Sequence, residues 1–490
     1  MAKSGSTSQW IARFARRQPD AVAVMHQDCP ISYRRLALLV LRVMHELTCA
    51  GVHSGQVLGV EAGDRFLHLL ILLAAEALGV TTMTLTASEC GPPANLDLLC
   101  DRIIAAQVLP VVDAAKLVRM PRDWFETILA AVPARPAENG QFDVLEHEPS
   151  PEAVVRIIKS SGTIGTPKVM GMTYRVQQGI IRKTVLYAPP FVQSHPDFLC
   201  LYNFGVRASH ARALFTLQRG GTIHLTGADV VWNLIAAGVG NFVLFVAGDL
   251  ERFVRTAPYG RGASELYVYV IGAEVPRRLR EETRTRVSGH FVATYSSNEV
   301  NLVSLVDDDN VGTLVPGVNV RIIDEHGRRA KPGQAGLIHI RSDTMTDGYI
   351  NAPDATRTVF VDGWFRSSDR GFQPAPGKLV VLGRDDDMLN IGGVKIAPGP
   401  IEQRLRAIDG VRDALVTTID DHLSTRIMLV AAETEPNADP TDLTEVIAPI
   451  VRAFVTYFQL IFLPAFPRTE TGKVRREAVK DLYRHQAQRL

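Results

Sequence analysis

Segments of helical and of strand-like periodicity alternate over the first half of the chain, and this alternation restricts the fold more than any other feature. Residues 33–50 and 66–78 carry apolar side chains at helical spacing. Between and after them, residues 56–61, 80–85 and 242–246 form short β-rich runs. Strands that alternate with helices usually pair in parallel, with the helices packed on the sheet. The sequence therefore predicts an α/β fold with a largely parallel sheet.

The pattern changes in the last third of the chain. Residues 318–323 and 336–340 are short β runs separated by turn residues, which predicts a small β-rich subdomain over about residues 303–384. A chain of 490 residues is also longer than one core usually serves. We therefore expect a large N-terminal α/β domain over residues 1–384, which includes the β-rich subdomain. A small C-terminal α+β domain is expected over residues 385–490.

Charge and cysteine content argue against several classes of protein. The 53 basic and 52 acidic side chains nearly cancel, so no global field favours nucleic acid as a partner. The five cysteines form no CxxC pair, which is typical of free thiols in a reducing compartment. Residues 1–20 lack the apolar core of a signal peptide, and the most apolar run, residues 69–80, is too short to span a bilayer. We expect a cytoplasmic protein with no membrane span and no nucleic-acid partner.

A loop rich in glycine and hydroxyl side chains follows the apolar run at residues 154–158. It reads Ser160-Ser161-Gly162-Thr163-Ile164-Gly165-Thr166-Pro167-Lys168. Glycines let successive backbone N–H groups face one anion, hydroxyls add donors, and a lysine supplies a positive charge. The lysine spacing is not that of a Walker loop. The pattern favours a phosphate site, and a solvated hairpin turn is the alternative for these residues taken alone.

This loop resembles the phosphate loop (Y/F)TSGTTGxPKG of the ANL superfamily of adenylate-forming enzymes. That superfamily comprises acyl-CoA synthetases, adenylation domains of nonribosomal peptide synthetases, and luciferases. The chain departs from the motif at Ile164 and Val169. The resemblance implies that ATP and a carboxylic acid form an acyl-adenylate with release of pyrophosphate, and that a thiol then accepts the acyl group. The implied phosphate-binding residues are Ser160, Ser161, Gly162, Thr163, Gly165 and Lys168.

Two later segments resemble the motifs that surround the base and the phosphates. Gly272-Ala273-Glu274 is similar to the segment that lies against adenine and the acyl pocket. Residues 294–299 resemble YGxTE. The resemblance implies that Tyr295 packs on adenine, that Asn298 contacts the α-phosphate where threonine is usual, and that Glu299 binds Mg²⁺, a hard cation suited to carboxylate oxygen.

Residues 362–369 resemble DGWxxTGD, whose last aspartate accepts the ribose hydroxyls, so this role falls to Asp369. The upstream segment, residues 348–353, also follows the superfamily pattern. Residues 383–396 resemble GRxDDxIKxxGxxI. By this likeness Arg384 also reaches the ribose.

Resemblance also assigns roles to the end of the chain. Residues 467–476 resemble PxTxxGKxxR, which makes Lys473 the catalytic lysine that contacts the carboxylate and the α-phosphate. Asp386 is the implied hinge about which a mobile C-terminal domain rotates between the two half-reactions. That rotation would bring Gly392 and Gly393 to the active site as the face for coenzyme A.

The acid pocket is expected near residues 202–207 and the helix that follows. Amino-acid-activating relatives place an aspartate after the phenylalanine, where this chain has Gly205, which argues against an α-amino acid. Asn203, Phe204 and Arg207 are the candidate pocket residues, the two polar ones reading a polar or anionic group or facing solvent. Aromatic, fatty and dicarboxylic acids all remain open.

The acceptor and the activity leave alternatives. No carrier domain is expected after Lys473, so the acyl group passes to coenzyme A or to a separate carrier protein, and coenzyme A is the commoner choice. An adenylate passed to another nucleophile and a luciferase-like oxygenase are further readings. Departures at Ile164, Ser296, Asn298 and Ser368 keep open a non-catalytic nucleotide-binding protein.

Overall fold

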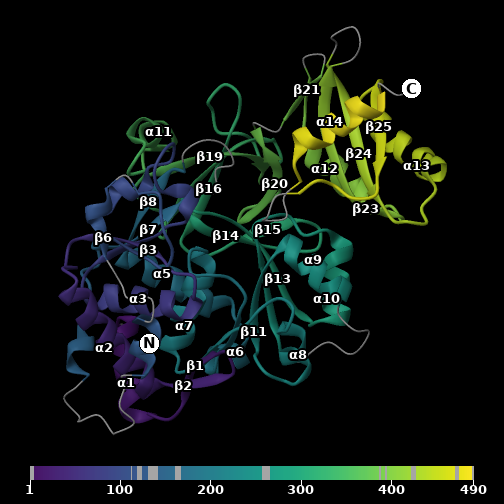
Figure 1. Cartoon of the computed structure of the whole chain (residues 1–490). Helices are drawn as coiled ribbons and strands as arrows, with labels where there is room; N and C mark the ends of the chain where they lie inside the picture. The colour runs from purple at the N-terminus through teal and green to yellow at the C-terminus, as the bar shows by residue number, and fades with distance from the viewer. Residues whose placement is uncertain are drawn as a thin grey trace.

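The computed structural model describes most of the 490-residue chain. The described residues are 5–111, 113–118, 124–130, 142–160, 167–256, 265–385, 388–391, 394–420, 426–468 and 474–487. Two sheets and the helices between them form the N-terminal part, and a smaller unit with its own sheet follows β20 (Figure 1).

One sheet has six strands in the order β6-β5-β3-β4-β7-β8. All neighbours are parallel except the last pair, β7 and β8, which is antiparallel. The strands are β3 (Val57–Glu61), β4 (Thr81–Thr84), β5 (Arg102–Ala105), β6 (Leu117–Val118), β7 (Val154–Lys159) and β8 (Val169–Thr173). Parallel neighbours joined by helices confirm the predicted α/β class.

The second sheet has 14 strands. Neighbours along the row β1, β10, β9, β11, β12 and β13 are parallel, and β14 to β20 pair antiparallel. Its path runs β16-β17-β19-β20-β15-β14-β13-β12-β11-β9-β10-β1-β2, and β18 pairs with β19. The strands are β1 (Val22–His26), β2 (Cys29–Ser32), β9 (Asp197–Cys200), β10 (Thr222–Leu225), β11 (Phe242–Val246), β12 (Tyr267–Ile271), β13 (His290–Ser297), β14 (Asn301–Val306), β15 (Val311–Leu314), β16 (Val318–Ile323), β17 (Gly336–Ser342), β18 (Phe360–Val361), β19 (Trp364–Phe372) and β20 (Lys378–Arg384). The β-rich part expected from about residue 303 is therefore a hydrogen-bonded continuation of the parallel sheet.

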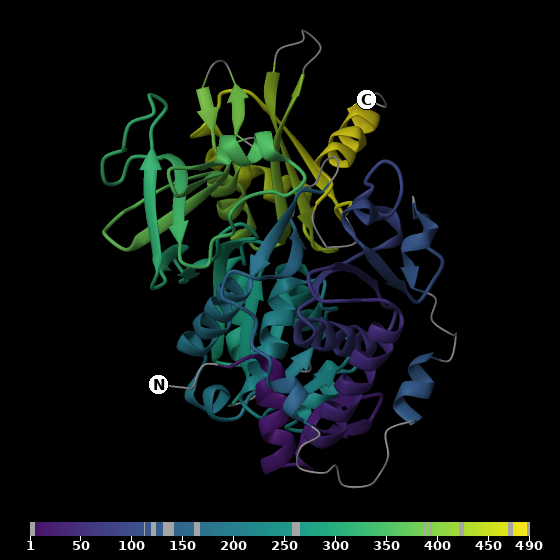
Figure 2. The same ribbon diagram turned by 90° about the vertical axis from the view of Figure 1, so that its left-hand side faces the viewer.

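Helices pack between and around these sheets (Figure 2). They are α1 (Thr7–Arg17), α2 (Tyr33–Cys49), α3 (Arg65–Ala77), α4 (Trp124–Ala130), α5 (Tyr174–Tyr187), α6 (Pro190–Ser194), α7 (Arg207–Gln218), α8 (Val231–Ala236), α9 (Ala247–Thr256), α10 (Arg277–Arg286) and α11 (Pro353–Val359). Helix α3 is buried on nearly every side because its sequence is apolar apart from Arg65, His68 and Glu76. One hydrophobic cluster joins α1, α2, α3 and α7 to strands of both sheets, so the two sheets share a core.

The C-terminal unit has its own hydrophobic clusters. A hairpin of β21 (Leu389–Ile391) and β22 (Val394–Ile396) precedes a sheet of β23 (Val411–Asp420), β24 (Arg426–Thr434) and β25 (Phe458–Leu463). Helices α12 (Pro398–Arg406) and α13 (Pro440–Arg452) cover one face, and α14 (Arg476–Ala487) covers the other. Neither cluster includes a described residue before Leu389. The domain boundary near residue 384 and the mobility of the unit both stay predictions.

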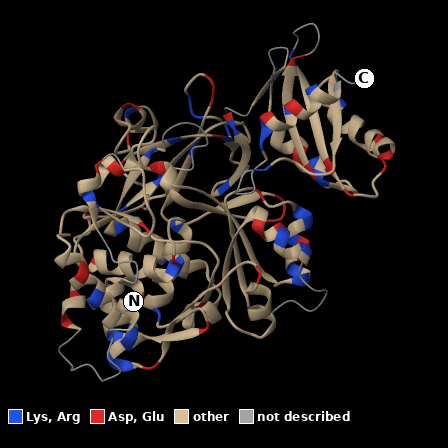
Figure 3. Cartoon of the chain, in the orientation of Figure 1, with Lys and Arg blue, Asp and Glu red and all other residues tan. Residues whose placement is uncertain are grey.

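Charged segments of both signs are interspersed over the two parts of the molecule (Figure 3). This distribution accords with a net charge of +1. Within the described ranges, every helix is too short or too polar to cross a membrane.

Candidate active site

The predicted phosphate loop connects the antiparallel strands β7 and β8. Lys159 and Val169 are paired, and the backbone N–H of Ser160 donates to the carbonyl of Lys168 at 2.8 Å. Ser161, Gly162, Thr163 and Gly165 lie outside the described residues, so the structure places only the two ends of the loop. Because β7 and β8 are antiparallel neighbours, the loop joins them as a hairpin connection. The two interpretations from the sequence, a phosphate site and a hairpin turn, therefore do not exclude each other.

Asn351 holds the far end of this loop from both sides of Lys168. Its side-chain amide donates to the carbonyl of Pro167 at 2.9 Å, and its Oδ1 accepts from the N–H of Val169 at 3.0 Å. The N–H of Ile350 adds a bond to the carbonyl of Val169 at 2.7 Å. Asn351, supported by Ile350, therefore clamps the loop end, a role that the sequence did not reveal.

Tyr349 connects the loop lysine to the predicted metal ligand. The Nζ of Lys168 lies 5.1 Å from the centre of the Tyr349 ring, and the Tyr349 hydroxyl donates to Oε1 of Glu299 at 3.0 Å. Burial, followed by the nearby Glu299 carboxylate, raises the pKa of Tyr349, so this hydroxyl keeps its proton. Glu299 is only 9% exposed. The contact fixes one carboxylate oxygen of Glu299 beside the loop.

The donor set around Glu299 suits one kind of metal. Among the described residues, there is no group of three or more His, Cys, Asp or Glu side chains that could hold a metal ion. Mg²⁺ is often bound by one or two carboxylates together with water and substrate phosphates. A single buried carboxylate beside the predicted phosphate loop fits that arrangement.

The predicted adenine and ribose residues come together at the junction of β13, β19 and β20. The Tyr295 hydroxyl donates to Oδ2 of Asp369, and Asp369 is directly paired with Arg384 across the antiparallel strands. Arg384 also donates to the hydroxyl of Ser368 at 3.0 Å. Burial, followed by the charge of Asp369, raises the pKa of Tyr295 well above its ordinary value, so the tyrosine stays a donor.

The turn after β13 is tied to two other elements. Asn298 donates through Nδ2 to the carbonyl of Lys159 at 2.7 Å. Arg207 donates to the carbonyls of Ser297 and Asn298 at 2.8 and 2.9 Å. Burial lowers the pKa of Arg207 to about 10, which leaves it charged at neutral pH. Arg207 therefore positions the turn that carries Asn298, a task that its sequence context did not suggest.

The remaining candidates for adenine and the acid differ in position. Gly272 follows the end of β12 in a left-handed conformation, with φ of 93°. Glu274 is exposed and accepts from Asn310 at 2.7 Å, and Ala273 is exposed beside it. Asn203 is exposed and its Oδ1 accepts from the N–H of Gly205 at 2.9 Å. Phe204 has no exposed surface and belongs to the core.

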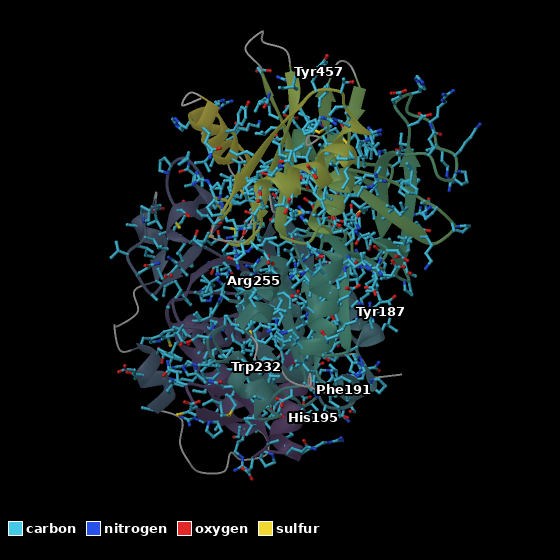
Figure 4. The ribbon with its side chains drawn as sticks, turned by 90° about the vertical axis from the view of Figure 1, so that its right-hand side faces the viewer. Tyr187, Phe191, His195, Trp232, Arg255 and Tyr457 are labelled. Carbon is cyan, nitrogen blue, oxygen red and sulfur yellow. The ribbon has the colours of Figure 1, made fainter. Side chains whose placement is uncertain are left out.

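A cavity of about 350 Å³ lies between α5, α7, β12 and the turn after β13, and we call it the α5–α7 cavity. Arg207, Gly272 and Asn298 line it, whereas Asn203 and Phe204 are not among its lining residues. Its other side chains include Ile180, Lys183, Thr184, Tyr187, Val206, Arg212, Tyr267, Tyr269, Ile271 and Leu302. Tyr187, at the end of α5, lies near the edge of the molecule above Phe191 and His195 (Figure 4).

A larger hollow of about 850 Å³ lies over β16, β17 and β19. None of the site candidates that the structure describes lines it. The smaller α5–α7 cavity touches the nucleotide candidates, so it is the better candidate for the acid.

Several predicted residues fall outside the described residues. These are Asp386, Gly392, Gly393 and Lys473. Among the described residues on either side of 469–473, Arg468 and Val474 form a β-bridge, and Arg468 pairs with Asp413 and Glu433 at 2.8 and 3.1 Å. The roles of all the predicted site residues stay predictions.

Comparison with known proteins identifies the family. The sequence matches the AMP-binding enzyme family over residues 11–350. It is 26% identical to an indoleacetate–CoA ligase of Aromatoleum aromaticum, over 97% of this chain and 98% of that protein. It is 23% identical to ScoC, a fatty acid–[acyl-carrier-protein] ligase of Streptomyces coeruleorubidus, over 96% and 95% of the two chains.

Solved structures agree on the fold. The ATP-bound MatB of Rhodopseudomonas palustris superimposes with a TM-score of 0.75 at 19% identity, over 97% of this chain and 99% of that one. The chain belongs to the AMP-binding enzyme family. This membership confirms the predicted ANL resemblance, the fold class and the general activity, ATP-dependent acid activation by an AMP-forming acid–thiol ligase.

Proposed function

We propose that this enzyme activates a carboxylic acid as an acyl-adenylate at the α5–α7 cavity and then transfers the acyl group to coenzyme A. One observation carries the proposal. Tyr295, near the end of β13, donates to the ribose candidate Asp369, which is paired with Arg384. Glu299, in the turn after β13, accepts from Tyr349, whose ring lies close to the loop residue Lys168. Nucleotide, metal and phosphate candidates thus converge from segments far apart in the sequence.

The first half-reaction joins two anions, a carboxylate and the α-phosphate of ATP. The site must neutralise their repulsion and align the carboxylate with the departing pyrophosphate. We assign the charge of Lys168 and the donors of residues 160–168 to the phosphates, and Lys473 to the reacting oxygens. Mg²⁺ held by Glu299 would neutralise phosphate charge. Asn298, held by Arg207, donates beside the same loop.

The acid lies, in this proposal, in the α5–α7 cavity, with its carboxylate toward Asn298. Three tyrosines, Tyr187, Tyr267 and Tyr269, give the cavity an aromatic lining. The indoleacetate-activating relative supports an aromatic acid. Gly205 stands where an aspartate would pair an α-ammonium group, which again disfavours α-amino acids.

Coenzyme A is the proposed acceptor in the second half-reaction, with a separate carrier protein as the alternative that the ScoC likeness keeps open. The predicted rotation about Asp386 would withdraw Lys473 and present Gly392 and Gly393. We also propose a cytoplasmic location, since all five cysteines are free thiols, as expected in a reducing compartment.

Pyrophosphate exchange over a panel of acids, with and without coenzyme A, tests this proposal. Exchange that depends on the acid is expected, and its absence with every acid would exclude acid activation. AMP release that requires coenzyme A is expected for a CoA ligase. Release that requires a phosphopantetheinylated carrier protein instead would reassign the acceptor.

A further inference from the structure

Arg212 is a buried arginine on the face of α7 that lines the α5–α7 cavity. It is only 5% exposed. Its guanidinium carbon lies 4.0 Å from the centre of the Tyr269 ring, and Nη1 donates to the carbonyl of Ala208 at 3.0 Å. Its Nε is buried and has no hydrogen-bond partner among the described residues. Among the described residues the guanidinium donates only to Ala208, so this cation lines the cavity with N–H groups to spare.

The other cations of the cavity have partners within the protein. Lys159 pairs with Glu89 at 2.7 Å. Lys183 pairs with the aspartate that follows β17 at 2.6 Å. Arg207 donates to two carbonyls of the turn after β13. Each of these cations therefore meets a carboxylate or two carbonyls, whereas Arg212 meets one carbonyl and an aromatic ring among the described residues.

A buried guanidinium is costly unless its charge and its donors are met. The face of an aromatic ring and one carbonyl meet part of that requirement. A carboxylate would meet the rest, because its two oxygens match the fork of guanidinium donors. An alkyl tail in the same place would displace water and leave the cation without a partner. The chemistry of the cavity thus favours an acid with an anionic far end.

The distance along β12 between Gly272 and the residue that Arg212 contacts indicates how long that acid is. Tyr267, Tyr269 and Ile271 alternate along one face of β12 and all line the cavity, and Gly272 follows at the nucleotide end. Tyr269 lies three residues before Gly272, which is about 10 Å at the rise of a β-strand. Arg212 stacks on Tyr269, so it lies at that depth below the nucleotide candidates.

We propose that Arg212 binds a second carboxylate at the far end of the substrate, so that this enzyme activates a dicarboxylic acid of about the length of a substituted aromatic ring. The inference rests on the proposed function, since it names the substrate class of the same cavity. Arg212 acts on substrate choice and holds the distal group, while the reacting carboxylate lies toward Asn298.

Matched acids test the proposal in the wild-type enzyme. Pyrophosphate exchange is measured with benzene-1,4-dicarboxylate and with two analogues whose far end is uncharged, 4-carbamoylbenzoate and 4-methylbenzoate. Adipate and heptanoate form the corresponding aliphatic pair. We expect the dicarboxylates to exceed their neutral counterparts in kcat/KM by about 30-fold or more, as for a charge-assisted bond. Neutral acids that equal or exceed the dicarboxylates would overturn the inference and leave acid activation standing. No exchange with any acid would instead contradict the proposed function.

Substitution of the arginine gives the second arm. Arg212→Met should lose the preference for dicarboxylates and gain on 4-methylbenzoate, and Arg212→Lys should keep part of the preference. Arg219→Met is the matched control, because Arg219 caps the same helix, stacks on Phe215 and donates to one carbonyl outside the cavity. An Arg212→Met enzyme that keeps the wild-type ranking of acids would overturn the inference. If that variant does not fold, the ranking by Arg212→Lys and by the wild type decides.

Discussion

Asp369 on β19 lies directly opposite Arg384 on β20 in antiparallel register, and the Tyr295 hydroxyl from β13 donates to the Asp369 carboxylate. One acceptor and one cation therefore face the same place from neighbouring strands. Diol hydroxyls of a ribose are donors as well as acceptors, so such a pair can bind them at once. This geometry gives the ribose assignment its first test.

Asp369→Asn should raise the KM for ATP in pyrophosphate exchange about 10- to 100-fold, since a charge-assisted bond becomes a neutral one. The variant should also distinguish ATP from 2′,3′-dideoxy-ATP less well than the wild type does. Asp354→Asn, at an exposed aspartate of α11, serves as the control. A variant that still discriminates the dideoxy nucleotide as the wild type does would refute the ribose contact.

Asn351→Ala should weaken the grip of the enzyme on ATP phosphates. The change removes both bonds that hold the loop end on either side of Lys168. Two such bonds are worth about 2 kcal/mol together, which corresponds to a rise of about 30-fold in the KM for ATP. Asn437→Ala, in an exposed turn of the C-terminal unit, should leave that KM unchanged. A KM for ATP equal to that of the wild type would show that Asn351 does not support ATP binding.

Lys473→Ala should abolish acyl-adenylate formation and spare thioester formation from a synthetic acyl-adenylate. The first step needs a cation between two anions, at a cost of about 100-fold or more in rate when it is lost, and the second step does not. Lys480→Ala, at a residue of α14 that pairs with exposed Glu477, is the control. Equal loss of both steps would contradict a lysine that serves only one of them.

Asp386→Pro should impair thioester formation more than adenylation. A proline restricts φ at the predicted hinge, so the rotation that separates the two half-reactions would slow. The two steps are measured separately, by pyrophosphate exchange and by thioester formation from synthetic adenylate. Unchanged thioester synthesis would argue against a hinge at this residue.

Acid should destabilise the protein through a buried histidine. Burial, with Arg156 and Lys159 adding repulsion, lowers the pKa of His68 to about 3. Below about pH 6.5 the unfolded chain protonates this imidazole and the folded protein does not, so stability falls with pH until the folded pKa is reached. Between pH 7 and pH 5, the free energy of unfolding of His68→Gln should therefore fall by about 2 kcal/mol less than that of the wild type.

Urea unfolding at the two pH values measures this difference. His147→Gln, at an exposed histidine, should show the pH dependence of the wild type. An identical pH dependence in His68→Gln and wild type would show that His68 titrates normally in the folded protein.

Local patterns in the sequence were enough for the fold class and for several elements. Strands β11 and β16 occupy the residues predicted for them, 242–246 and 318–323. Alternation and β-branching are properties of neighbouring residues, so a strand can be found without its partners. Sheet membership is not such a property. The predicted β-rich subdomain therefore proved continuous with the parallel sheet, through the pairing of β13 with β14.

The candidate site divides in the same way. Motif resemblance pointed to Tyr295, Glu299 and Asp369, and gave the family that comparison confirmed. It assigned no task to Tyr349 or Asn351, although both lie in a segment that follows the superfamily pattern.

The sequence by itself determined the class of chemistry, because short motifs carry the residue types that phosphate and ribose require. Only the tertiary structure decided how those residues are used. The Asn351 clamp joins segments 182 residues apart. Arg207 donates to two backbone carbonyls, while Arg212, five residues later on the same helix, lines the cavity and donates to only one described carbonyl. Two arginines of one helix look alike in sequence. Only their tertiary contacts, of Arg207 with the carbonyls after β13 and of Arg212 with Tyr269 on β12, make one a support and the other a candidate for substrate recognition.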